Sequence, residues 1–103
     1  MDTDTQTKLA ALLRAAAVRT VSEDDFWREF KTLIDPFADP VAGIAYETAT
    51  HYWGNFHERN LLLMRSKPDR HQVKQGKEAL NLIAEGLERD CPIEELKRKL
   101  DDI

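Results

Sequence analysis

Apolar residues recur at steps of three and four along most of this chain, which is the spacing of one face of an α-helix. Near the start, four such residues stand in an alanine-rich stretch: Leu9, Leu12, Leu13 and Ala16. Because alanine favours helix formation, this stretch predicts a helix over residues 4–19. The chain shows no sustained alternation of apolar and polar residues, which would mark half-buried strands. The pattern therefore predicts an all-α fold.

A capping signal predicts the start of a second helix. Ser22 precedes three acidic residues, which places a hydroxyl at the N-cap and negative charge in the first turn. Phe26, Phe30 and Leu33 then share one face of this helix. Pro36 ends it, because the residue before a proline avoids the helical conformation.

Asp39 and Pro40 form the next start signal, with a carboxylate at the cap and a proline in the first turn. The residues that follow place one apolar arc on a helix: Val41, Ala45, Ala49, Tyr52 and Phe56. Gly54 weakens the end of this arc, and the later leucines would fall on its polar side. We therefore expect a break or bend between Gly54 and Asn60.

Two further helices are predicted in the last third of the chain. The fourth keeps the spacing of three and four with Val73, Gly76, Leu80, Ile83 and Leu87. The fifth follows Pro92 and carries Ile93, Leu96 and Leu100. Four main helices with short connections, followed by a short C-terminal helix, predict an antiparallel bundle that forms a single domain over residues 1–103.

The aromatic residues are concentrated in the second and third helices, since all of them lie between positions 26 and 56. We expect these helices to supply most of one core, whose members are Phe26, Phe30, Leu33, Tyr52, Phe56, Leu80 and Ile83. Trp27 is the exception, because it falls beside the acidic residues on the helical wheel and is a candidate for an exposed anchor.

Length and composition narrow the class of protein. With 103 residues, 42% of them hydrophobic, the chain has enough apolar matter for one core but not for two. The single cysteine, Cys91, cannot form an internal disulfide, which favours a reducing compartment. No run of about 18 apolar residues is present, as a membrane-spanning helix would require. These features predict a soluble cytoplasmic protein.

Charge is divided unevenly along the chain. Residues 1–58 carry 10 acids and 5 bases, residues 59–77 carry 1 acid and 6 bases, and residues 78–103 carry 8 acids and 4 bases. The acidic residues of the second predicted helix form a negative surface, which attracts basic partners. We predict that this surface binds a protein partner through Glu23, Asp24, Asp25, Trp27 and Glu29. The alternative binding face is a basic stripe on the fourth helix, formed by Arg70, Lys74 and Lys77. The pI of 5.3 disfavours a nucleic-acid partner.

Signatures of catalysis are missing from the sequence. It contains no P-loop, dinucleotide-binding fingerprint, HExxH motif or nucleophile elbow. The strongest constellation is a set of polar residues on the third helix: Glu47, His51, Asn55 and Glu58. A metal site would need further ligands from another helix. We therefore expect a solvated helix face there, and neither enzymatic activity nor a bound cofactor or metal.

The segment from Val21 to Leu63 contains two features of interest: a serine-capped helix with the phenylalanine spacing of Ser22, Phe26 and Phe30, and the aromatic segment 52–56. In these features the segment resembles the small all-helical bacterial immunity proteins of the colicin D and contact-dependent inhibition type. The resemblance implies a fold of about four helices, no catalysis, and inhibition of a toxin domain by a charged surface that covers its active site. The helix predicted over residues 4–19 and the basic block at residues 59–77 have no clear place in that pattern.

Two other functional interpretations remain open. A helical regulatory or structural protein would form a homodimer through its first helix or through the apolar positions from Val73 to Leu87. An enzyme or a metal-binding protein would use Glu47 and His51.

Overall fold

Helices account for all the regular secondary structure in the parts of the chain that the structure describes. The computed structural model describes the backbone of residues 1–61 and 70–103, and the side chains of residues 1–56 and 71–103. Within these parts it contains five helices and no strands: α1 (Thr3–Ala17), α2 (Glu23–Leu33), α3 (Pro40–Leu61), α4 (Arg70–Glu88) and α5 (Ile93–Asp101). The predicted all-α fold is confirmed.

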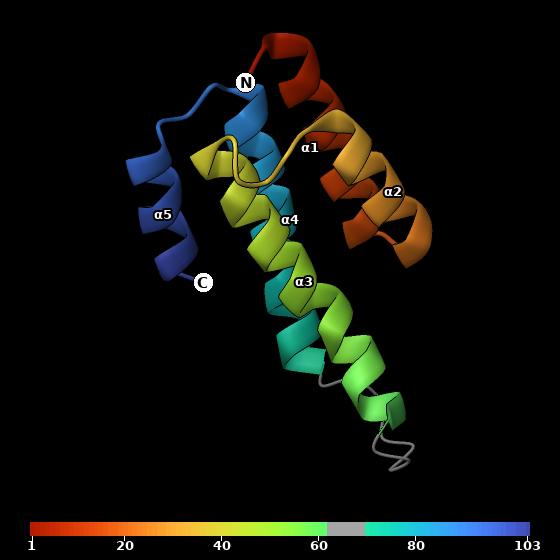
Figure 1. Ribbon diagram of the computed structural model, residues 1–103. Helices are drawn as coiled ribbons and strands as arrows, with labels where there is room; N and C mark the ends of the chain where they lie inside the picture. The colour runs from red at the N-terminus through yellow and green to blue at the C-terminus, as the bar shows by residue number, and fades with distance from the viewer. Residues whose placement is uncertain (62–69) are drawn as a thin grey trace.

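Successive helices run in opposite directions (Figure 1), as the sequence predicts. The central helix is α4, and both α1 and α3 pack along it, while α2 lies against α1 and α5 against α4. Two polar contacts join α1 to the far end of the fourth helix: Gln6 donates a hydrogen bond to Asp90 at 3.0 Å, and Arg14 forms an ion pair with Glu88. The predicted antiparallel bundle is therefore confirmed.

The helix starts follow the capping residues seen in the sequence. The Ser22 hydroxyl accepts a hydrogen bond from the Asp25 amide at 3.2 Å, and the Asp39 carboxylate accepts one from the Val41 amide at 2.8 Å. At the first helix, Asp2 accepts from the Thr5 amide at 2.7 Å, and this bond lowers the pKa of the Asp2 carboxyl. These bonds satisfy amides that have no partner within their own helix.

The first helix ends two residues earlier than predicted. Arg19 has a φ of 59°, the left-handed conformation that glycine usually supplies at a helix end. The Thr20 amide then bonds back to the Ala15 carbonyl at 2.9 Å, which closes the helix after Ala17. Asp90 has a φ of 54° and ends α4 in the same way.

The predicted break in the third helix is wrong, because α3 is continuous from Pro40 to Leu61. Glycine in a helix interior costs only about 1 kcal/mol relative to alanine. Tyr52 and Trp53 are buried beside Gly54, and Phe56 is half-buried against the same core. Their packing is enough to keep this segment helical.

One hydrophobic core joins the helices. It includes five of the seven residues expected there, Phe26, Phe30, Tyr52, Leu80 and Ile83, and the other two, Leu33 and Phe56, are partly buried against it. Aromatic side chains of α2 and α3 pack together, with the rings of Phe30 and Tyr46 5.9 Å apart. This packing turns one face of α2 inwards and the opposite face towards solvent.

Candidate functional site

The acidic residues of α2 lie on its solvent-facing side. Asp24, Asp25 and Glu29 are exposed, whereas Phe26 and Phe30 on the other face are fully buried. We call these three acids the acidic face. Glu23, the fourth acid in the prediction, is half-buried and takes part in other interactions.

Trp27 is not the exposed anchor that the sequence suggested. Its indole is half-buried and lies 4.9 Å from the ring of Phe26 and 5.2 Å from that of Tyr46. Tyr46 projects from α3 and packs against the side of α2 on which Trp27 lies. A helical wheel of α2 alone places that side towards solvent. Trp27 therefore belongs mainly to the aromatic cluster between α2 and α3.

The most exposed aromatic residue among the described side chains is instead Phe37, one of the aromatic residues between positions 26 and 56. Its side chain is 92% exposed in the turn between α2 and α3. The turn is held by Asp35, whose carboxylate accepts a hydrogen bond from the Phe37 amide at 2.9 Å. Its position between Pro36 and Pro40, outside both helices, was the signal in the sequence that could have identified it.

Because Phe37 has so few neighbours, its replacement by serine should leave the fold intact. We expect the free energy of unfolding to change by no more than about 0.5 kcal/mol. Urea denaturation monitored by circular dichroism measures this value. A loss well above that size would show that Phe37 packs on the protein in solution.

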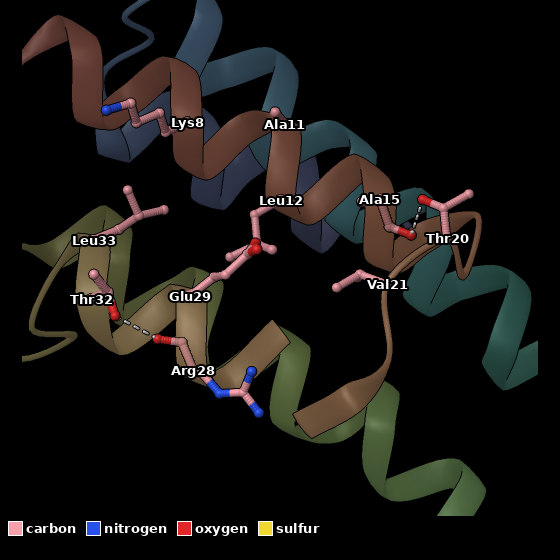
Figure 2. Close-up of a pocket in the computed structure, with 10 residues that line it drawn as sticks. All are labelled: Lys8, Ala11, Leu12, Ala15, Thr20, Val21, Arg28, Glu29, Thr32 and Leu33. Atoms are coloured by element: carbon pink, nitrogen blue, oxygen red, sulfur yellow. Dashed lines mark hydrogen bonds between the residues drawn. The ribbon is translucent and has the colours of Figure 1, made fainter. Parts of the chain in front are cut away.

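An open groove lies beside the acidic face, between α1 and α2 (Figure 2). Its volume is about 650 Å³. Leu12 extends from α1 towards α2, and Glu29 extends from α2 towards α1. The other lining residues are Lys8, Ala11, Ala15, Thr20, Val21, Arg28, Thr32 and Leu33. The groove is therefore mainly apolar, with charged groups along its edges.

The charges of the groove are unequally compensated. Lys8 forms an ion pair with Asp4 at 3.0 Å, and Arg28 forms one with Asp25 at 2.9 Å. Glu29 makes no ion pair within the part of the chain whose side chains are described. When Asp4 and Asp25 are counted with the cations they pair, the charges in and beside the groove sum to −1, and Glu29 is the acid that carries this excess.

The predicted basic stripe lies elsewhere, on α4. Lys74 and Lys77 are exposed there. Arg70 begins the helix, but its side chain lies outside the described residues. Neither Lys74 nor Lys77 lines the groove between α1 and α2.

The polar constellation on α3 is only partly brought together. His51 and Asn55 line a second pocket, of about 470 Å³, which α4 closes with Gln75 and Gly76. Glu47 is exposed and does not line this pocket, and the Glu58 side chain lies outside the described residues. Among the side chains that are described, no three His, Cys, Asp or Glu residues gather to hold a metal ion.

Cys91 lies in the turn between α4 and α5, beside Glu95. Burial raises the pKa of its thiol, and the hydrogen bond and negative charge of Glu95 raise it further. The thiol therefore stays protonated at neutral pH, which is unfavourable for a nucleophile because the thiolate is the reactive form.

Comparisons of the chain with protein-family models, with curated proteins and with solved structures find no match. Within the described residues, no helix has the length and apolar character needed to cross a membrane.

Proposed function

We propose that this protein is a non-catalytic binding module that recognises a basic protein surface through the acidic face of α2. The observation that carries the proposal is the exposure of Asp24, Asp25 and Glu29 on one side of a helix whose other side is fixed in the core. A rigid element that presents several like charges accelerates association with an oppositely charged partner.

An immunity or antitoxin-like inhibitor of a cytoplasmic toxin domain is the specific form of this proposal. Such an inhibitor needs only a complementary surface that covers the toxin's active site, and it needs no chemistry of its own. The segment that resembles immunity proteins, from Val21 to Leu63, includes α2, the helix that carries the acidic face. A toxin domain that binds nucleic acid would present the basic surface that this helix fits.

Reversal of Asp24, Asp25 and Glu29 to lysine tests the proposed function. We expect a folded variant that associates with the partner about tenfold more slowly at low ionic strength, with a smaller difference at high salt. Stability should fall by only about 1 kcal/mol, because the first turn loses two acids that complement the helix dipole. The partner is first isolated by affinity purification, and association is then measured by stopped-flow fluorescence.

The chain offers a matched control for this variant. Glu94 and Glu95 occupy the first turn of α5, as Asp24 and Asp25 occupy that of α2, and Glu47 is an exposed acid in α3. Reversal of these three residues changes the net charge equally and should leave association nearly unchanged. An equal slowing by both variants would refute recognition through α2. Slowing only on reversal of Lys74 and Lys77 would identify the basic stripe as the binding face.

The structure gives less support to self-association through the faces that the sequence suggested. Leu80, Ile83 and Leu87 of α4 are buried in the core, and so are Leu9 and Leu13 of α1. A homodimer would therefore have to use residues other than these five.

A further inference from the structure

The groove between α1 and α2 is an unfilled apolar surface formed by two helices. Leu12 provides a buried floor, and Val21 and Leu33 are half-buried at its opposite ends (Figure 2). Two alanines on α1, Ala11 and Ala15, face the groove one helical turn apart. Their small side chains leave room for a neighbouring backbone to approach α1 closely.

The shape of this groove suits a helix better than a compact small molecule. It is open along its length between two neighbouring helices, and its lining extends from Lys8 to Thr20 on one side and from Arg28 to Leu33 on the other. An amphipathic helix binds such a surface by placing apolar residues from successive turns into the groove.

Charge determines which amphipathic helix fits. Lys8 and Arg28 are already paired with acids of their own helices, whereas Glu29 extends over the groove without an ion pair among the described side chains. A helix with lysine or arginine beside its apolar face would neutralise Glu29. A helix with acids at these positions would meet an uncompensated carboxylate.

We infer that the groove binds an amphipathic helix of the partner, with its apolar face against Leu12 and a cationic side chain paired with Glu29. The inference rests on the proposed function, since it names the element of the basic partner that the protein recognises. Burial of apolar side chains in the groove supplies affinity, while Glu29 favours a helix that carries positive charge beside its apolar face.

Two synthetic peptides serve as probes. Both are about 16 residues long, so that they can form helix in isolation. Both carry leucines at positions i, i+3, i+4 and i+7 in an alanine background. One has three lysines flanking the leucines, and the other has three glutamates at the same positions. Fluorescence anisotropy of labelled peptide measures binding to the full chain.

We expect the lysine peptide to bind about tenfold more tightly than the glutamate peptide. Glu29→Lys should reverse this preference. Glu47→Lys, which changes the net charge equally at an exposed site outside the groove, should alter each affinity by no more than about twofold. Ala11→Phe should weaken the binding of both peptides, because it fills the groove from an exposed position. Circular dichroism verifies that each variant is folded.

Equal effects of Glu29→Lys and Glu47→Lys would overturn the inference, because attraction would then follow net charge rather than the groove. Unchanged binding by the Ala11→Phe variant would overturn it as well. The double variant Asp24→Lys/Asp25→Lys, which retains Glu29, tests the proposed function separately with the isolated partner. If this double variant associates more slowly with the partner, but Glu29→Lys and Ala11→Phe do not change the affinities of the peptides, the proposed function stands and the groove inference fails. If it leaves partner association unchanged, recognition through Asp24 and Asp25 fails.

Discussion

Replacement of Phe30 by alanine should lower the free energy of unfolding by about 3–5 kcal/mol, the usual cost of deleting a large buried side chain. Phe30 is fully buried, and its ring centroid lies 5.9 Å from each of the Phe26, Trp27 and Tyr46 rings. These residues come from two helices, so the space cannot close without moving α2 relative to α3. A domain with ordinary stability of about 5–15 kcal/mol would lose a large part of it.

Urea denaturation of the Phe30→Ala and Phe37→Ala variants measures this effect with an internal control. The two substitutions delete the same atoms, but Phe37 is 92% exposed and Phe30 is 0% exposed. We expect the Phe37 variant to match the original protein within about 0.5 kcal/mol. Equal losses in the two variants would contradict the packing described here.

The sequence predicted the starts of helices well because capping is local chemistry. The N-cap roles of Ser22 and Asp39 depend on amides only two or three residues away, and both are observed. The end of α1 was less predictable. Arg19 adopts a left-handed conformation that its residue type does not favour, and its guanidinium lies 4.4 Å from the centre of the Phe56 ring, in a distant helix. Contacts of this kind cannot be seen in a local pattern.

The acidic face was predictable for a similar reason. The spacing of Phe26 and Phe30 determines which side of α2 faces the core and therefore which side carries the acids. The groove was not predictable, because it depends on how far α1 and α2 stand apart, and the packing of side chains from several helices sets that separation. The partial burial of Trp27 was not predictable either, because it depends on contact with Tyr46 of α3, which a helical wheel of α2 does not include.

Gly76→Ala should destabilise the protein by about 2 kcal/mol, although alanine is the better helix former. A Cβ atom at position 76 would lie only 2.8 Å from Cδ1 of the Tyr52 ring. That ring is held in place, because the Tyr52 hydroxyl donates a hydrogen bond to the Ala16 carbonyl at 3.0 Å and the ring contacts Trp53 and Phe56. The clash therefore pushes α4 away from α3.

Gly54→Ala is the matched control, since a Cβ atom there meets nothing within 4 Å. We expect it to stabilise α3 by about 0.5–1 kcal/mol, so the two glycine substitutions should have opposite signs in the same urea assay. A double-mutant cycle identifies the cause. If close contact with the ring explains the loss, Gly76→Ala should cost much less in a Tyr52→Leu background than in the original protein. An undiminished cost there would mean that Gly76 matters for a reason other than the approach of Tyr52.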